Sequence, residues 1–363
     1  MSPNIVHVLG ARPNFVKAAP VIAALDAAGA NDRIIHTGQH YDERLSKVFL
    51  DELRLPQPHY NLAVGSGSQA DQTAALLTRL EPVLLTEQPD AVVVYGDVNS
   101  TLAGALVAAK LCLPLVHVEA GLRSFDRTMP EEVNRRVVDV LSDLHLVTSP
   151  EAVDHLVQEG VDPQGVHLVG NPMIDTLLAY RDRFDPDRAR SAYGLRDEYG
   201  VVTVHRPANV DDPDSAGAVV TALHELAEHL PLVFPVHPRG RQRLEAVGLG
   251  ADPRIHLIQP APYVDFLSLV QGARLVITDS GGLQEETSIL GIPCLTVRPN
   301  TERPITITHG TNRLVAADQI VEQAVRILAG HRPVPDTRPP LWDGQAAPRC
   351  ARRILEWLAS RSS

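Results

Sequence analysis

Short apolar runs alternate with longer helical patterns along most of the chain. In its first half, the runs that predict strands are 5–9, 33–37, 91–95, 115–118, 145–148 and 166–169. The stretches between them have the spacing of helices, namely 15–28, 43–53, 69–86, 101–111, 131–142 and 150–159. This alternation predicts a mostly parallel sheet covered by helices on both faces.

A second series of the same kind follows an interruption. The stretch from Tyr180 to Tyr199 is rich in Arg and Asp and has no strand pattern. Strands are then predicted at 201–204, 232–235, 255–258, 275–278 and 294–297, and a proline-rich connector at 331–340 leads to a last helix at 345–358. We predict two α/β domains, 1–180 and 181–340, and a C-terminal helical segment, 341–363, which could pack back on the first domain. Two such domains side by side would form a central cleft at the carboxyl ends of their strands, where open α/β sheets bind ligands.

Composition narrows the function classes. The chain has 363 residues, of which 44% are hydrophobic and 21% charged, a normal globular balance. The net charge of −11 argues against nucleic acid or an anionic membrane as the main partner, although it allows a local basic pocket. No signal peptide and no apolar stretch of membrane-spanning length is visible, so we expect a cytoplasmic protein.

The three cysteines suggest neither a metal site nor a disulfide framework. Cys112, Cys294 and Cys350 are isolated from one another in the sequence. Cys112 and Cys294 lie in apolar runs, and we expect both thiols to be buried. The histidines show no metal-ligand spacing either, because no second histidine or carboxylate lies one helical turn away.

The sharpest motif is the segment 278–286, TDSGGLQEE, at the end of a predicted strand. Ser280, Gly281 and Gly282 open the next helix, where free backbone N–H groups and the helix dipole favour a phosphate. Glu286 lies one turn further in, where a carboxylate can accept from two ribose hydroxyls. An ordinary serine-capped turn would use the same residues.

Charged residues follow several other predicted strands. Arg12 and Lys17 come after the first strand, in GARPNFVK, which lacks the glycines of a Walker loop or dinucleotide fingerprint. Asp97, Glu119 and Glu131 stand at strand ends or at a helix start, where a carboxylate in a dry cleft can act as acid or base. Helix capping is the alternative for Glu131.

Two histidines and an arginine occupy matching places in the second half. His205 and His237 each follow a strand, and Arg303 lies in the loop after 294–297. Residues of these types can hold a diphosphate or move a proton. The alternative for the two histidines is a position in the core with their hydrogen bonds satisfied there. The alternative for Arg303 is an ordinary polar loop.

Together these motifs resemble the non-hydrolysing UDP-N-acetylglucosamine 2-epimerases. The resemblance runs from Gly10 to Gly344 and includes GARPNFVK, TGQH, YGDVNSTLA, HVEAGLRS, MPEEVNRR, GNPMIDTL, VHRPANV, DSGGLQEE and TERP, in that order. It implies two Rossmann-like domains of the GT-B glycosyltransferase type and interconversion of UDP-GlcNAc and UDP-ManNAc. It also implies that UDP is eliminated to leave 2-acetamidoglucal and is then added back, with no nicotinamide cofactor and no metal, in a homodimer.

The resemblance also implies roles for individual residues. The catalytic group would be Asp97, Glu119, Glu131 and His205. Substrate binding would involve Arg12, Lys17, Arg135, His237, Phe266, Ser280, Gly281, Gly282, Glu286 and Arg303. Gln39 and His40 match a region where some members bind a second UDP-GlcNAc as an activator. The first domain would then carry the catalytic carboxylates and the second would bind UDP.

The chain departs from the usual family pattern in three places. Asn14 and Ala208 replace glutamates that many members have, and the segment between Glu119 and Glu131 is shorter than in several members. Ala208 removes a carboxylate beside His205, which leaves the basicity of that histidine and the sugar preference open. A hydrolysing relative that releases ManNAc and UDP, a GT-B glycosyltransferase and a UDP-sugar sensor remain as alternatives. The pathway is open as well, since polysaccharide and secondary-metabolite biosynthesis both fit.

Overall fold

The computed structural model of the chain consists of two compact units. Unit 1 is formed by Met1–Ala179 together with Pro340–Ser363, and unit 2 by Tyr180–Pro339. The residues described are 2–38, 50–195, 198–236, 238–331 and 338–361. The predicted helix at 43–53 therefore lies mostly outside the described residues.

Unit 1 is built on a parallel sheet of seven strands within the described residues. They are β1 (Asn4–Leu9), β2 (Asn31–His36), β3 (Tyr60–Asn61), β4 (Ala91–Tyr95), β5 (Leu115–Ala120), β6 (Leu144–Val147) and β7 (Val166–Leu168). Their order is β3-β2-β1-β4-β5-β6-β7. Every residue of β4 and β5 is buried, because helices cover both faces of the sheet.

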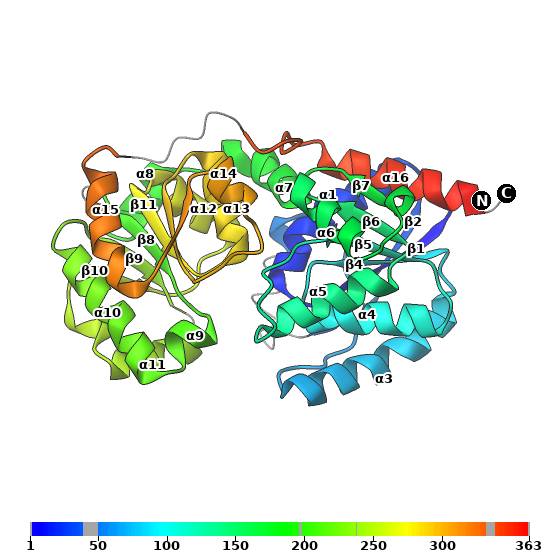
Figure 1. The fold of residues 1–363 in the computed structure, drawn as a ribbon, viewed down its shortest axis with the longest axis horizontal. Helices are drawn as coiled ribbons and strands as arrows, with labels where there is room; N and C mark the ends of the chain where they lie inside the picture. Colours follow the sequence, from blue (N-terminus) through cyan, green and yellow to red (C-terminus); the bar gives the residue numbers. More distant parts are fainter. Residues whose placement is uncertain (1, 39–49, 196–197, 237, 332–337, 362–363) are drawn as a thin grey trace. The chain divides into compact units, whose positions relative to one another are not determined.

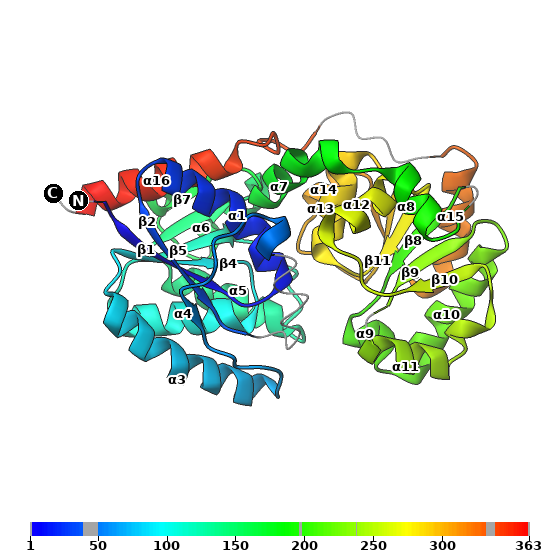
Figure 2. The same ribbon diagram turned by 180° about the vertical axis from the view of Figure 1, so that it is seen from behind.

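The helices of unit 1 lie on the two faces of this sheet. They are α1 (Arg12–Ala27), α3 (Gln69–Glu87), α4 (Asn99–Lys110), α5 (Pro130–Leu141), α6 (Pro150–Gln158), α7 (Pro172–Tyr180) and α16 (Ala346–Arg361), with a 3₁₀ turn, η1 (Pro163–Gly165). Helices α3, α4 and α5 cover one face, and α1 and α16 lie side by side on the other (Figure 1, Figure 2). Leu76, Leu80 and Val138 from the first group pack on Val8 and Val94 of the sheet.

Unit 2 repeats the arrangement, with six strands in the part of it that the structure describes. These are β8 (Gly200–Thr203), β9 (Leu232–Pro235), β10 (Ile255–Ile258), β11 (Leu275–Thr278), β12 (Cys294–Val297) and β13 (Asn312–Val315), in the order β10-β9-β8-β11-β12-β13. All the strand pairs within it are parallel over the described residues.

Its helices again cover both faces. They are α8 (Pro186–Ala192), α9 (Pro207–Val210), α10 (Pro213–Ala227), α11 (Pro238–Ala246), α12 (Tyr263–Gly272), α13 (Gly281–Leu290), α14 (Ile305–Thr308) and α15 (Ile320–Leu328), with 3₁₀ turns η2 (Arg181–Arg183), η3 (Leu249–Ala251) and η4 (Ala317–Gln319). Helices α10 and α15 share one hydrophobic core with the sheet, and α8 and α12 pack together on the opposite face (Figure 1).

Both strand orders have a topological switch point. In unit 1 it lies between β1 and β4, and in unit 2 between β8 and β11. The connections leave these neighbouring strands toward opposite faces, which opens a crevice at the carboxyl edge of the sheet where α/β proteins bind ligands. The two-domain α/β fold predicted from the pattern is thus confirmed. No helix among the described residues is long and apolar enough to cross a membrane.

Candidate functional site

Glu119 and Lys17 form a buried ion pair at the switch point of unit 1. Glu119 is 3% exposed and Lys17 is 5% exposed, and the Lys17 Nζ atom donates to Glu119 Oε2. Because a lone charge in the interior would be costly, the contact with its partner offsets the cost of burying each group. Sequence analysis had placed the two residues in separate roles, and the fold brings them together.

The backbone at Glu119 is shaped to direct its side chain. The register between β5 and β6 shifts between Val118 and Ala120, which is a β-bulge at Glu119, and Glu119 has a left-handed φ of 70°. A non-glycine residue seldom adopts this conformation, and such conformations are concentrated at functional sites.

Gly96 leaves the space that this pair fills. Its φ is +63°, and a Cβ there would lie 3.0 Å from Glu119 Oε2 and 3.1 Å from Lys17 Nζ. Asn14 closes the other side: its Oδ1 accepts from the Gly10 and Ala11 N–H groups, and its Nδ2 donates to the Tyr95 carbonyl at 2.8 Å. A glutamate could not make that last bond, so the Asn14 departure has a structural use in this chain.

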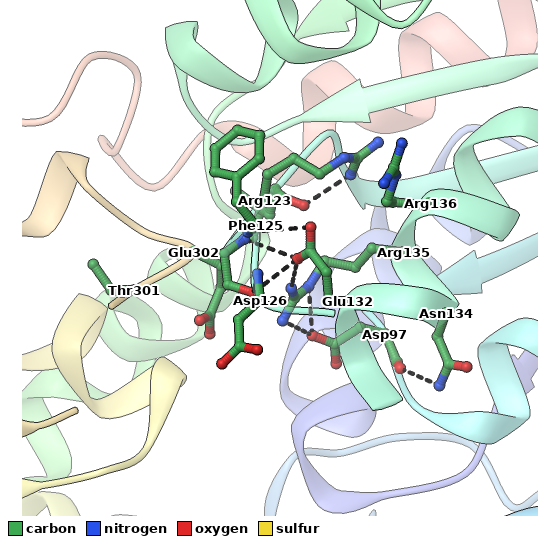
Figure 3. A network of polar contacts seen from close by, with 12 residues as sticks. Asp97, Arg123, Phe125, Asp126, Glu132, Asn134, Arg135, Arg136, Thr301 and Glu302 are labelled. Carbon is green, nitrogen blue, oxygen red and sulfur yellow. Dashed lines mark hydrogen bonds and ion pairs between the residues drawn. The ribbon is translucent and has the colours of Figure 1, made fainter. Parts of the chain in front are cut away.

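Asp97 is held by the first turns of α5 (Figure 3). Arg135, 2% exposed, donates from Nε to Asp97 Oδ2 at 3.0 Å, and its Nη2 lies 2.9 Å from the same oxygen as an ion pair. Its Nη1 donates to Glu132 Oε2 at 2.7 Å, and Asn134 Nδ2 donates to the Asp97 carbonyl at 2.8 Å. The guanidinium of Arg135 is therefore paired with the carboxylates of both Asp97 and Glu132.

Glu132 is a member of this network that sequence analysis missed. Its carboxylate is 1% exposed and accepts from the N–H and hydroxyl of Ser124 and from the N–H of Phe125. Its neighbour Glu131, the predicted catalytic residue, is half-buried in the same turn. The pair Glu131-Glu132 could not be separated by residue type, because only the direction of each side chain on the helix distinguishes them.

A second buried network lies behind Glu119. His117 makes hydrogen bonds through Nδ1 to Asp139 Oδ1 at 2.7 Å and through Nε2 to the Gly96 carbonyl at 2.8 Å. Asp139 also pairs with Arg123 and accepts from the Gly121 N–H. Burial favours the neutral carboxyl, but His117 and Arg123 outweigh it and lower the pKa of Asp139. These contacts hold the backbone at Gly96 and Gly121, next to Asp97 and close to Glu119.

His205 and Asp279 meet at the switch point of unit 2. They follow the adjacent strands β8 and β11, and His205 Nδ1 lies 2.9 Å from Asp279 Oδ1. The carboxylate of Asp279 also accepts from the N–H groups of His205 and Arg206 and from Asn209 Nδ2. Burial would raise the pKa of Asp279, yet the His205 side chain, Asn209 and the Arg206 N–H outweigh it and lower the pKa.

The first turn of α13 has the features expected of an anion site. Ser280 is the residue that precedes the helix, but its side chain makes no capping hydrogen bond, so the serine-capped turn is not what the segment forms. The backbone N–H groups of Gly281 and Gly282 stand at the positive end of the helix dipole. Phe266, half-buried on α12, lies on the same face of the sheet.

Glu286 is buried one turn further along α13. Its Oε1 accepts from the Tyr263 hydroxyl at 3.1 Å. Burial raises the pKa of Glu286 to about 8, against the effect of this hydrogen bond. Burial therefore favours the protonated form of the side chain at neutral pH.

Arg303 is packed against the start of α13 and is already paired. Its guanidinium contacts Glu302, and Nε lies 2.9 Å from Glu285 Oε1. A Cβ at Gly281 would collide with this guanidinium. Gly281 is thus required for the close approach of Arg303, in addition to any role with a phosphate.

The remaining predicted residues are placed as follows. Arg12 is the first residue of α1 and is half-buried. Gln39, His40 and His237 lie outside the described residues. Among the described residues, no group of three or more His, Cys, Asp or Glu side chains could hold a metal ion.

The two parallel sheets, each with helices on both faces, define a two-domain α/β protein of the GT-B type. The family model described as UDP-N-acetylglucosamine 2-epimerase matches residues 23–355. The UDP-N-acetylglucosamine 2-epimerase of Methanocaldococcus jannaschii is 40% identical over 95% of this chain and 97% of its own. The UDP-2,3-diacetamido-2,3-dideoxy-D-glucuronate 2-epimerase of Pseudomonas aeruginosa is also 40% identical, over 98% of this chain and 99% of its own.

A solved structure supports the same assignment. The M. jannaschii UDP-GlcNAc 2-epimerase in complex with UDP-GlcNAc and UDP matches with a TM-score of 0.91 and 40% identity, covering 98% of this chain and 99% of that one. The chain belongs to the UDP-N-acetylglucosamine 2-epimerase family.

Proposed function

We propose that this protein interconverts UDP-GlcNAc and UDP-ManNAc without net hydrolysis. The observation that supports it most is the placement of two carboxylates, Glu119 and Asp97, at the switch point of unit 1, each paired with a buried cation. An ionised carboxylate held at a ligand-binding edge is suited to accept a carbon-bound proton.

The proposed reaction has two steps that mirror each other. A carboxylate takes the C2 proton, the C2–H electrons form the C1–C2 double bond, and the C1–O bond breaks to release UDP and 2-acetamidoglucal. UDP then adds back to C1 while a proton returns to the opposite face of C2. One proton and UDP leave, and a proton and UDP are added back, so the reaction needs no redox partner. Its main demand is stabilisation of the departing diphosphate.

The residues have distinct roles in this proposal. Asp97, Glu119 and Glu131 exchange protons with C2 and the ring hydroxyls, and His205 assists the departing phosphate. The nucleotide is bound by Arg12, His237, Phe266, Ser280, Gly281, Gly282, Glu286 and Arg303. Lys17 and Arg135 act by positioning the carboxylates of Glu119 and Asp97, with which they form ion pairs.

Three further proposals accompany the reaction. Gln39 and His40 would bind a second UDP-GlcNAc as an activator, the enzyme would act in the cytoplasm, and the chain would form a homodimer. Val133 and Val140, exposed by 44% and 74%, lie seven residues apart on one face of α5 and offer an apolar surface for a second copy. A single species of monomer mass in sedimentation velocity at micromolar concentration would contradict the dimer.

Incubation with UDP-GlcNAc in deuterated water tests the reaction. We expect deuterium at C2 of both UDP-GlcNAc and UDP-ManNAc, detected by NMR and mass spectrometry, because the C2 proton is exchanged with solvent. Glu119→Gln should lower the rate by roughly 10²-fold or more. UDP-GlcNAc recovered unlabelled and unchanged, with a second portion of UDP-GlcNAc present as activator, would rule out the proposal for this substrate.

The same experiment separates the alternatives. Accumulation of free ManNAc and UDP would identify a hydrolysing enzyme, which begins with the same elimination. A glycosyltransferase would leave C2 unlabelled and would need an acceptor. Three carboxylates at the edge of unit 1 favour chemistry at C2 over simple transfer.

A second substrate is favoured by one comparison. The P. aeruginosa relative, whose name specifies UDP-2,3-diacetamido-2,3-dideoxy-D-glucuronate, is as similar to this chain as the M. jannaschii enzyme. Parallel assays with both nucleotide sugars decide between them through kcat/KM. A higher kcat/KM for the diacetamido glucuronate would replace UDP-GlcNAc as the proposed substrate.

A further inference from the structure

The side chains of His205 and Asp279 are brought together by the sheet of unit 2. Strands β8 and β11 are parallel neighbours in which Thr203 pairs with Thr278. The Asp279 N–H donates to the Thr203 carbonyl at 3.1 Å, and the two threonine hydroxyls lie 2.7 Å apart. Rigid strand ends therefore fix the distance between the imidazole and the carboxylate.

Asp279 is surrounded by hydrogen-bond donors. It is 0% exposed, and its two oxygens accept from the backbone N–H groups of His205 and Arg206 and from Asn209 Nδ2, at 2.8–3.1 Å. Such a set of donors favours the ionised carboxylate. The His205 side chain adds to this effect, and together they lower the pKa of Asp279 against burial. An ionised carboxylate accepts hydrogen bonds and cannot donate one.

The contact with His205 therefore determines which ring nitrogen holds a proton. Nδ1 lies 2.9 Å from Asp279 Oδ1, so Nδ1 carries the hydrogen. In the neutral ring the lone pair is then on Nε2. The His205 side chain is 62% exposed, which leaves this atom accessible to a ligand.

We propose that Asp279 is the positioning residue of His205: it fixes the Nδ1–H tautomer and the ring direction, so that Nε2 is the atom that exchanges a proton with the diphosphate. This inference rests on the proposed function. When the C1–O bond breaks, Nε2–H of the imidazolium gives its proton to the departing phosphate oxygen, and the neutral ring keeps the proton on Nδ1. Re-addition of UDP returns the proton to Nε2, while Asp279 stays ionised throughout.

Asp279 places a carboxylate beside His205, where Ala208 offers none. Ala208 is exposed in the first turns of α9, whereas Asp279 comes from the end of β11. The guanidinium of Arg206, the next residue in the chain, lies 3.9 Å from Glu302. Asp279 is thus the carboxylate whose hydrogen bond with His205 the structure shows.

The variant Asp279→Asn reverses the tautomer with little change in size. The asparagine oxygen can still accept from Arg206 N–H and Asn209 Nδ2, while its amide nitrogen faces His205 Nδ1 and donates to it. The neutral ring then carries its hydrogen on Nε2 and can no longer accept a proton there. We expect kcat to fall by roughly 10²-fold or more, with a smaller change in KM.

The tautomer is measured directly by ¹⁵N NMR of histidine-labelled full-length protein without substrate. His205→Gln identifies the His205 signals by their loss. At a pH where the ring is neutral, we expect a protonated Nδ1 in the wild type and a protonated Nε2 in Asp279→Asn. A wild-type ring with its hydrogen on Nε2 would overturn the proposal, whether or not the enzyme proves to be an epimerase. This measurement also stands if Asp279→Asn fails to fold.

A double-mutant cycle gives the functional test. If Asp279 acts through His205, adding Asp279→Asn to His205→Gln should lower kcat by less than twofold further. Asp252→Asn, which removes an ion pair with Arg254 at the surface of the same unit, is the matched control and should keep the wild-type kcat. A full additional loss in the double variant would mean that Asp279 is merely structural and would overturn the inference.

Discussion

At the scale of single residues, the candidate catalytic groups occur as pairs with a partner from a distant segment. Glu119 lies against Lys17, Asp97 against Arg135 and His205 against Asp279. Burial of an unpaired charge would cost several kcal/mol, so a carboxylate at the floor of such a site needs a cation or several donors. Each pair fixes the direction of both side chains before any substrate arrives.

Glu286 leads to a prediction about the pH dependence of UDP binding. Burial raises its pKa to about 8 in the free protein, whereas ribose hydroxyls would donate to the ionised carboxylate. Binding would then release a proton, so affinity for UDP rises with pH up to about 8 and levels off above it. By isothermal titration calorimetry, we expect binding at pH 7 to be roughly tenfold weaker than at pH 9.

The variant Glu286→Gln isolates this effect. Glutamine has no titrating proton, so the affinity of the variant should be independent of pH between 7 and 9. Glu322→Gln, at an exposed position of α15 in the same unit, should behave like the wild type. A wild-type Kd that is constant over this range would disprove the proposed contact.

Cys112 shows how a residue-level prediction failed. Its apolar surroundings in the sequence predicted a buried thiol, but Cys112 is exposed and has a φ of 54° just after α4. The turn that ends the helix directs this side chain outward, and an average over neighbouring residues cannot show that. The same prediction was correct for Cys294, which lies inside β12.

At the scale of elements, strand ends position the site. The predicted strand 115–118 extends to Ala120 as β5, and the bulge at Glu119 lies in the added part. The pattern missed β3 and β13, because β3 has only two residues and β13 has four, of which the first two are polar. Short edge strands depend on a neighbour for pairing more than on their own sequence.

Helix α5 carries a prediction at this scale. Glu132→Gln removes the charge that joins Arg135 to the N–H groups of Ser124 and Phe125. One amide N–H of glutamine would then face another donor, so we expect the free energy of unfolding to fall by about 2–4 kcal/mol. Arg135 would then lose its contact with Glu132 and would hold the Asp97 carboxylate less firmly. We therefore expect kcat/KM to fall about tenfold.

Chemical denaturation and initial rates measure these two effects. Glu356→Gln, at an exposed ion pair on α16, should change the free energy of unfolding by less than about 1 kcal/mol. Equal behaviour of Glu132→Gln and this control would show that the α5 network contributes nothing to stability or to rate.

At the scale of the whole molecule, the chain leaves unit 1 once and returns to it. After unit 2, the segment Pro340–Ser363 rejoins unit 1, where α16 packs beside α1. Asp175 of α7 receives the start of α16: its carboxylate accepts from Ala346 N–H at 3.1 Å and from Ala347 N–H at 2.6 Å. The Asp175 side chain thus contacts two residues that follow it in the chain by 171 and 172 positions.

This contact predicts a pH-dependent stability. Burial raises the pKa of Asp175 to about 6 from its usual 3.8. Since the folded state holds this proton more tightly than the unfolded state, the contribution of Asp175 to stability is fully present below pH 4 and is lost as pH rises through about 6. We expect the wild type to lose about 2–3 kcal/mol more than Asp175→Asn between pH 4 and pH 7.

Urea unfolding at a series of pH values, followed by circular dichroism, tests this prediction. Asp26→Asn, at an exposed position near the end of α1, provides the matched control and should follow the wild type. Parallel curves for Asp175→Asn and the wild type would contradict the raised pKa.

The sequence by itself determined most of the element order, the two-domain α/β class and the family, because the hydrophobic period and the motifs can be read along the chain. It also identified Asp97, Glu119, His205 and Glu286 as residues at strand ends or helix starts. Only the tertiary structure decided what these residues contact. Lys17 contacts Glu119, which is 102 positions away in the sequence, and His205 contacts Asp279, which is 74 positions away. These contacts form because parallel strands bring distant segments to one edge of the sheet. Burial, and with it the pKa of Glu286 and Asp279, depends on this packing and is therefore invisible in the sequence.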